Sequence, residues 1–256
     1  MAGYIFYTHN TFTNHHISMA IESISKQDRP FSFDEFIIYN NSTDIQTSFI
    51  VNQFYKFGLQ NSFKKLLTFN NYPDTRSVSE DLEFQRDNIV GHSWYLVHKG
   101  DFYLPRHFLG EICKNPPSKT GKAHYLNFCK FDLRETVSDD LIREMSEFTS
   151  FDELASQEYA NHTDNPNFKY PPDLTTDHVA IGYRGKGPKF DGVMHCYNEE
   201  ARQKIDFSSY WKMEHITKNR SNGILMEIDR SKYFVLHMFH DIGRTDPMKQ
   251  TPGHRF

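Results

Sequence analysis

Short runs of consecutive apolar residues alternate, in the first half of the chain, with segments that carry apolar residues at helical spacing. The runs are rich in aromatic and β-branched side chains and stop at polar clusters; they are residues 4–7, 33–39, 66–69 and 94–97. Ile17, Ile21 and Ile24 show the helical spacing that follows the first run. Strand-length runs that alternate with helical segments predict a mixed, mainly parallel sheet flanked by helices, and therefore an α/β fold.

The sequence also predicts several helices and where they begin. Ser77 and Glu80 have the spacing of a capping box, which predicts a helix over residues 77–90. Residues 49–67 mix apolar and polar positions at helix-like spacing before the third strand. Pro105 precedes an apolar segment and predicts that a helix starts shortly after the fourth strand.

The second half of the chain is less regular. Its predicted strands are residues 123–131, 224–228 and 233–240, and residues 138–154 predict one or two polar helices. Residues 161–172 are rich in Pro, Asn and Asp, which indicates either a linker or a loop over a site.

Composition narrows the class of protein. A chain of 256 residues and 30.2 kDa favours one fairly large domain. The net charge of -4 excludes a global attraction to nucleic acid or anionic membranes, although local basic patches remain possible. The three cysteines are an odd number and lack metal-type spacing, which argues against a disulfide scaffold and a Cys-based zinc site and indicates a reducing compartment. No apolar window approaches the roughly 18 residues of a membrane span, so we expect a cytoplasmic protein.

The first candidate for chemistry follows the fourth apolar run, at His98-Lys99-Gly100-Asp101. In open α/β sheets, ligands bind outside the carboxyl ends of the strands, and this segment delivers a carboxylate to such an end. Asp101 is therefore a candidate ligand or catalytic residue. The alternative is that Gly100 and Asp101 only form a turn.

Two segments resemble the nucleotide-sugar-binding half of GT-A-fold glycosyltransferases, particularly the family-2-like group. Residues 36–44 end in Asn-Asn-Ser-Thr-Asp, where that group usually has Asp-Asn-Ser-Ser-x-Asp or a similar sequence. Residues 95–105 are similar to the later strand that ends in Asp-x-Asp, followed by Pro and an apolar helix. The resemblance covers roughly residues 4–112. The chain also resembles the compact enzymes of this type that large viruses and phages have. It implies a GT-A-like, Rossmann-like single domain with an irregular acceptor half.

Within that domain, the resemblance implies a nucleotide-sugar-binding half over residues 1–122 and an acceptor-binding half over residues 123–256. The chain departs from the family at two motifs. Aligned on Pro105, the acidic positions of Asp-x-Asp fall on His98 and Gly100, so only the adjacent Asp101 remains. Asn40 stands where the second-strand motif often has Asp, and its amide offers both a donor and an acceptor.

The implied reaction transfers a sugar from a nucleoside diphosphate sugar, with a UDP sugar favoured, to an acceptor hydroxyl. A divalent metal, Mn or Mg, neutralises the diphosphate in such enzymes. The expected metal ligands are Asp101 and a late His, with His237 preferred over His240 because the two face opposite sides of a strand. The residues expected around the nucleotide sugar are Thr8, His9, Asn10, Asn40, Asp44, Arg86, His98, Lys99, Arg184 and Lys186.

Inverting members of the group use a carboxylate base to deprotonate the acceptor. Asp177 is the first candidate and Asp191 the second, although Asp177 is equally suited to an N-cap. A retaining reaction needs no such base. Arg184 and Lys186 lie in a basic, glycine-rich segment that either closes over the diphosphate or remains solvated.

The acceptor remains open between a glycan, a protein and a hydroxymethylated DNA base. A viral enzyme of this kind would act in the host cytoplasm. Two alternatives compete with a glycosyltransferase: a catalytically inactive nucleotide-sugar or glycan-binding module, which the incomplete Asp-x-Asp favours, and a metal-dependent nucleotidyltransferase on a similar scaffold.

Overall fold

A computed structural model describes residues 1–70, 77–117, 121–133, 137–150, 153–154, 194–209 and 214–238. One sheet of eight strands forms its centre, in the order β3-β2-β1-β4-β7-β6-β8-β5. The strands are β1 (Ala2–His9), β2 (Phe33–Asn41), β3 (Phe63–Asn70), β4 (Trp94–Lys99), β5 (Phe102–Tyr103), β6 (His124–Asp132), β7 (His195–Asn198) and β8 (Leu225–His237). The helices are α1 (Asn14–Ser25), α2 (Thr47–Lys56), the 3-10 turn η1 (Leu59–Asn61), α3 (Val78–Asn88), α4 (Phe108–Lys114), α5 (Asp139–Met145), α7 (Glu199–Arg202) and α8 (Glu214–Ser221).

The sheet is mixed, as the sequence predicts. Strands β3, β2, β1 and β4 are parallel, β7 pairs antiparallel with both β4 and β6, and β8 pairs parallel with β6. The chain leaves β1 for β2 and β3 on one side and returns to β4 on the other side. The carboxyl ends of β1 and β4 therefore meet at a topological switch point, where open α/β sheets bind their ligands.

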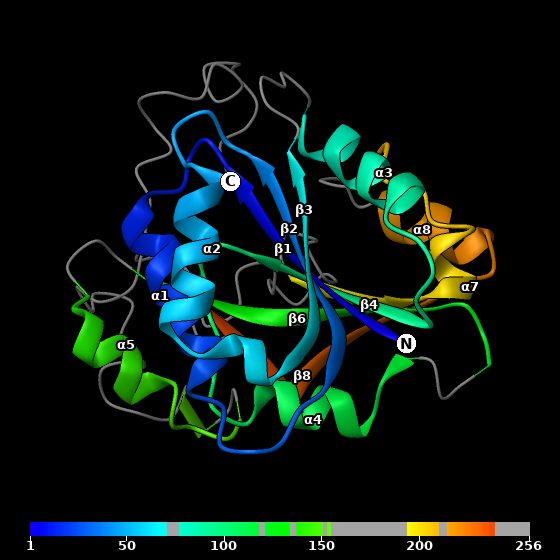
Figure 1. Ribbon diagram of the computed structural model, residues 1–256. Helices are drawn as coiled ribbons and strands as arrows, with labels where there is room; N and C mark the ends of the chain where they lie inside the picture. The colour runs from blue at the N-terminus through cyan, green and yellow to red at the C-terminus, as the bar shows by residue number, and fades with distance from the viewer. Residues whose placement is uncertain are drawn as a thin grey trace, which may run out of the picture.

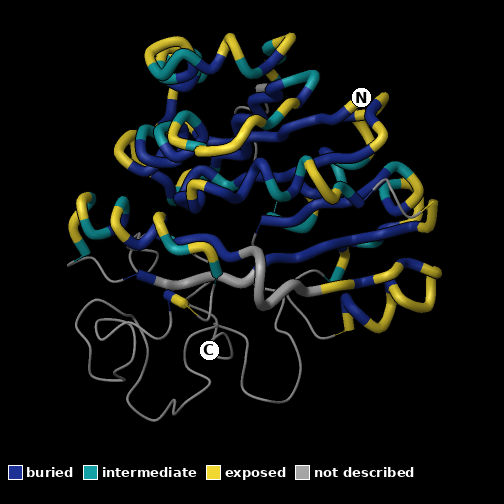
Figure 2. Tube along the Cα trace, turned by 90° about the horizontal axis from the view of Figure 1, so that it is seen from below, coloured by how far each residue is buried: buried dark blue, intermediate teal, exposed yellow. Residues whose placement is uncertain are grey.

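Helices cover both faces of the sheet (Figure 1). Apolar residues of α1, α2, α4 and α5 pack on one face together with Tyr4 and Phe6 of β1. Helices α3, α7 and α8 cover the other face, where Ile5 and Tyr7 point. Strands β1, β2 and β4 are buried along most of their length, whereas the edge strand β3 is half-buried or exposed over residues 64–69. Exposed residues follow the outer helix surfaces and the loops (Figure 2). Burial on both faces explains why β1, β2 and β4 contain continuous apolar runs.

The capping box predicted at the start of α3 is confirmed. The Ser77 side chain accepts a hydrogen bond from the Glu80 amide, and the Glu80 carboxylate accepts one from the Ser77 amide at 2.7 Å. Helix α1 has a similar start, at which Thr13 caps the helix and His16 accepts a hydrogen bond from the Thr13 amide. His16 is thus occupied in a helix cap.

Three predicted boundaries differ in the structure. The segment 49–67 contains α2, the turn η1 and the start of β3, so its helix ends at Lys56. The two strands predicted over 224–228 and 233–240 are one strand, β8, whose register with β6 shifts at a bulge. Strand β7 was not predicted because its four residues are too short for a periodic signal.

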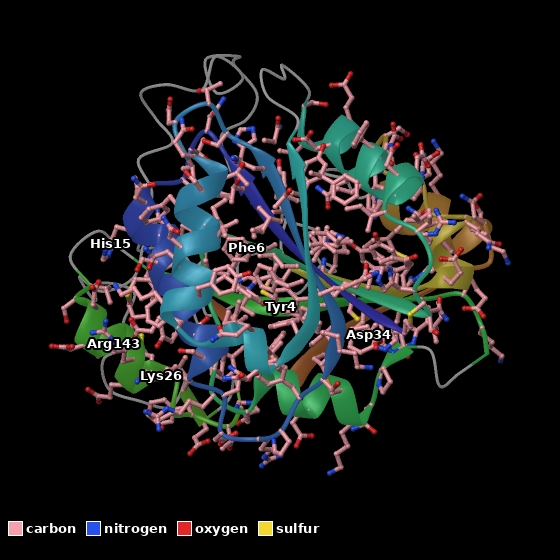
Figure 3. All side chains as sticks on the ribbon, in the orientation of Figure 1. Tyr4, Phe6, His15, Lys26, Asp34 and Arg143 are labelled. Atoms are coloured by element: carbon pink, nitrogen blue, oxygen red, sulfur yellow. The ribbon has the colours of Figure 1, made fainter. Side chains whose placement is uncertain are left out.

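Strand β7 also joins the two halves of the chain, because it lies between β4 and β6 in the sheet. Figure 3 shows Tyr4 and Phe6 in the interior and His15, Lys26 and Arg143 at the outer side of the α1 layer. Arg143 of α5 donates to Glu22 of α1 at 2.7 Å, which ties these two helices together. Among the described helices, none is long and apolar enough to cross a membrane.

Candidate functional site

The candidate site lies at the carboxyl ends of β1 and β4. Tyr7 is the register partner of Lys99 in this parallel pair, and the Gly100 amide donates to the Tyr7 carbonyl at 2.8 Å. The chain then turns into the two-residue strand β5, which pairs with the end of β8. The turn that carries Asp101 is therefore held between β1 and β8.

Gly100 is closely packed at this turn. A Cβ atom at this position would overlap the Cδ1 methyl of Ile17 and would lie 3.5 Å from the rings of Phe12 and Phe6. A side chain at this position, where the aligned Asp-x-Asp motif has its second acid, would therefore require the end of the Ile17 side chain to move.

Asp101 and His237 meet at this turn, as the sequence predicts for two metal ligands. The His237 Nε2 lies 3.0 Å from the Asp101 Oδ2, and the Asp101 carboxylate is fully buried. The Met238 amide donates to the Asp101 carbonyl at 2.9 Å, and the His237 ring stacks on Phe102 at 4.8 Å between centroids. Strand β8 therefore brings a late His to the switch point.

The donor set at this point suits a divalent cation in its chemistry. A carboxylate oxygen and an imidazole nitrogen are both ligands that Mn and related metals accept. Within the described ranges, no group of three or more His, Cys, Asp or Glu side chains is placed to hold a metal ion. Asp101 and His237 would thus share the metal with oxygens of the substrate or of water.

The structure places His98 away from the expected nucleotide contact. Its side chain is fully buried on the opposite face of β4 from Val97, where its Nδ1 contacts the Tyr4 hydroxyl and its Nε2 lies 2.9 Å from the Phe102 carbonyl. Burial lowers the pKa of the His98 imidazole to about 4, although the hydrogen bond to Phe102 and the charge of Asp101 act in the opposite direction. Both ring nitrogens of His98 thus have partners in the core, so the structure lends no support to its expected contact with the nucleotide sugar.

Thr8 and Asn40 are brought together at the ends of β1 and β2. The Thr8 hydroxyl donates to the Asn40 Oδ1 at 2.5 Å, and the Asn40 amide donates to the Ile45 carbonyl at 2.8 Å and to the Thr47 hydroxyl at 2.9 Å. Both side chains are buried. The side-chain amide of Asn40 was expected to face the nucleoside. It instead forms hydrogen bonds that hold the loop between β2 and α2.

The exposed polar residues of this edge lie on the two neighbouring loops. The Asn10 side chain accepts from the Thr43 amide at 2.6 Å, and Asp44 accepts from the Thr43 hydroxyl at 3.0 Å. Both residues are exposed, whereas His9 is half-buried beside Tyr7. Asn10 and Asp44 are thus the predicted nucleoside contacts that solvent can reach.

Lys99 and Arg86, both predicted at the phosphates, lie in different places. The Lys99 Nζ is 5.6 Å from the ring centroid of Phe12 and 5.9 Å from that of Phe102, next to the turn that carries Asp101. Arg86 donates to the Ile205 carbonyl at 2.7 Å and to Asp87 at 2.8 Å. Arg86 thus ties α3 to the segment after α7 and does not join the other candidates.

A buried carboxylate of α3, Asp81, was not predicted from the sequence. Asp81 accepts from the Tyr7 hydroxyl at 2.9 Å, from the Tyr39 hydroxyl at 3.1 Å and from the Asn41 amide. Burial and the neighbouring carboxylate raise the pKa of Tyr7 well above its usual value. The alternation of side chains along β2 could have indicated this cluster, because it places Tyr39 and Asn41 on the face opposite Asn40.

The remaining predicted residues lie outside the described part of the chain. These are the candidate bases Asp177 and Asp191, the basic residues Arg184 and Lys186, and the alternative metal ligand His240.

Comparisons with known proteins identify the fold. No family model matches the sequence, and no curated protein matches it. S. aureus TarS 1-349 in complex with UDP-GlcNAc is similar in structure, with a TM-score of 0.53 and 15% identity over 98% of this chain and 61% of that chain. The mannosyltransferase PcManGT from Pyrobaculum calidifontis, in complex with GDP-Man and Mn2+, has a TM-score of 0.55 and 10% identity over 94% of this chain and 58% of that chain. The chain thus has the α/β GT-A glycosyltransferase fold and spans about three fifths of these two structures.

Proposed function

We propose that this chain is a nucleotide-sugar-dependent glycosyltransferase. The observation that carries the proposal is the contact between Asp101 and His237 at the switch point of a GT-A sheet. A buried carboxylate paired with a late imidazole at this edge fits a site for a metal–diphosphate group better than it fits a structural turn.

The chemistry of the donor explains why such a pair is needed. When a sugar leaves a nucleoside diphosphate, negative charge develops on the diphosphate, and a bound divalent metal, Mn or Mg, stabilises that charge as a Lewis acid. Asp101 and His237 would hold the metal. Lys99 adds a positive charge beside the same turn and would offset part of the charge on the diphosphate.

The proposal also covers the donor, the acceptor and the residues that contact them. UDP sugars are favoured for the donor, with Asn10, His9 and Asp44 around the nucleoside. Asp177, or Asp191 in its place, would deprotonate the acceptor in an inverting reaction, and Arg184 and Lys186 would contact the diphosphate. A glycan, a protein and a hydroxymethylated DNA base are the acceptor classes to test, in the cytoplasm of the producing or host cell.

A thermal-shift panel tests donor binding directly. UDP and GDP sugars, each with and without manganese, are compared on the wild type, on Asp101→Asn and on Asp87→Asn as a control that removes an exposed carboxylate from α3. We expect a metal-dependent rise in the melting temperature that Asp101→Asn abolishes and Asp87→Asn retains. The absence of a shift with every donor would refute the proposal.

The second candidate is a nucleotide-sugar-binding module without catalysis, which is favoured by the loss of acidic side chains at His98 and Gly100. Release of the nucleoside diphosphate from a donor that binds separates the two functions. An active enzyme releases it at a rate that Asp101→Asn reduces, whereas a binding module releases none.

A further inference from the structure

Besides the contact between Asp101 and His237, three hydrogen bonds hold the turn that carries Asp101 in place. The Gly100 amide donates to the Tyr7 carbonyl at 2.8 Å, and the Met238 amide donates to the Asp101 carbonyl at 2.9 Å. These two ties are backbone hydrogen bonds. The third tie is made by a side chain, because the His98 Nε2 lies 2.9 Å from the Phe102 carbonyl oxygen.

The partners of His98 determine which ring nitrogen carries the proton. A carbonyl oxygen only accepts hydrogen bonds, so the Nε2 that faces Phe102 must donate. A neutral imidazole then has an unprotonated Nδ1, which accepts from the Tyr4 hydroxyl. The two hydrogen bonds therefore run in one direction, from Tyr4 through His98 to the backbone of Phe102.

Tyr4 is itself fixed in the core. Its ring stacks on Phe36 at 5.3 Å and meets the edge of Phe33 at 5.1 Å, and neither Tyr4 nor His98 is exposed to solvent. Burial raises the pKa of Tyr4 well above its usual value, so the hydroxyl keeps its proton as a donor. The pair is a rigid support that reaches the site turn from inside the protein.

We propose that Tyr4 and His98 are positioning residues that hold the Phe102 carbonyl and thereby fix Asp101 against His237. This inference rests on the proposed function, since Asp101 and His237 serve there as metal ligands. Phe102 follows Asp101 directly, and its ring stacks on His237. A peptide that is free to rotate at Phe102 would displace both groups. Residues that hydrogen-bond directly to a metal ligand typically contribute 10–100-fold in metal affinity, and this pair, which acts through the neighbouring peptide, is expected near the lower end of that range.

A merely structural role for the pair makes a different prediction. A buried polar pair that only completes the core would lower stability when it is disrupted, without a selective effect on the turn. Tyr4→Phe removes one hydroxyl and keeps the ring, His98→Phe removes both hydrogen bonds, and His98→Gln keeps an amide donor for the Phe102 carbonyl. Tyr95→Phe is the matched control, because it removes a buried tyrosine hydroxyl near the other end of β4, where Tyr95 donates to Glu199.

The experiment measures two quantities on each folded variant. Calorimetric titration with Mn2+ in the presence of UDP gives the metal affinity, and hydrogen exchange of the segments that contain Gly100 and Met238 reports the turn. We expect His98→Phe to weaken Mn2+ binding about tenfold or more and to speed exchange at both segments. Tyr4→Phe should act in the same direction with a smaller effect, His98→Gln should restore most of the affinity, and Tyr95→Phe should leave both quantities unchanged.

The two claims fail in different ways. If the wild type binds neither Mn2+ nor UDP, the proposed function is refuted, and the exchange data still judge the support of the turn. If the wild type binds both and His98→Phe and Tyr4→Phe match Tyr95→Phe in affinity and exchange, the positioning role is overturned. Should His98→Phe fail to fold, the comparison of Tyr4→Phe with Tyr95→Phe decides the question.

Discussion

Replacement of Gly100 by alanine tests the packing of the site turn. The added Cβ would overlap the Ile17 Cδ1 methyl, well inside the contact distance of about 3.5–4.0 Å between carbon atoms. Gly100 is not among the described glycines with a positive φ, so alanine can adopt its backbone conformation. The loss of stability therefore comes from packing and not from backbone strain.

The structure sets the size of the effect. Overpacking of a buried site costs about 1–3 kcal/mol, which corresponds to a fall in Tm of roughly 2–12 °C for a chain of this size. Ile17→Val removes the Cδ1 methyl itself and costs about 0.5–1.5 kcal/mol when it is made alone. In the double variant the methyl that clashes is gone, so Gly100→Ala should add little to the cost of Ile17→Val.

Urea unfolding of the wild type, both single variants and the double variant gives a thermodynamic cycle. We expect a coupling free energy of about 1–3 kcal/mol that favours the double variant. If the two single effects add within about 0.5 kcal/mol, the contact between Gly100 and Ile17 does not limit the packing of this turn.

Three further predictions concern other parts of the molecule. Ser77→Ala removes the cap of α3 and should lower the free energy of unfolding by about 1 kcal/mol in urea titration, with Ser77→Asp close to the wild type. Thr8→Val removes the hydrogen bond to Asn40 and should cost about 1 kcal/mol, which Thr8→Ser should largely recover; equal losses in both variants would contradict the role of the hydroxyl. Burial lowers the pKa of His215 to about 4. Between pH 6.5 and 4, the imidazole is therefore protonated in the unfolded chain but not in the folded chain. The free energy of unfolding should fall as the pH falls through this window. In His215→Gln the dependence of the unfolding free energy on pH should be weaker over that window, and an unchanged slope would rule out this residue as its source.

The first half of the fold was predictable because its strands are buried on both faces. Continuous apolar runs ended by polar clusters locate β1, β2 and β4, and the capping box locates α3. The sequence did not reveal β7, whose four residues pair antiparallel between two other strands and carry two polar side chains, His195 and Asn198. Short strands of this kind are fixed by their neighbours and leave no periodic pattern.

The site was predictable where it depends on strand ends and was missed where it depends on side-chain direction. Asp101 was singled out because it follows a strand, and His237 because the family resemblance implies a late His ligand; the end of β8 brings the two side chains within 3.0 Å. His98 was expected at the nucleotide sugar, but both faces of β4 are covered by the core, so its side chain is buried whichever face it takes. Asp81 was overlooked because its partners, Tyr7 of β1 and Tyr39 of β2, lie 74 and 42 residues away from it in the sequence.

Asp101 and His237 are 136 residues apart in the sequence, so the ribosome synthesises them at different times. At about 5–20 residues per second of synthesis, His237 is made roughly 7–27 s after Asp101. During that interval the nascent chain carries β1, β2, β3 and β4 without the strand β8 that completes the candidate site. The parallel strands β1 to β4 are therefore synthesised early, and the pair that we assign to the metal cannot form until β8 has been made.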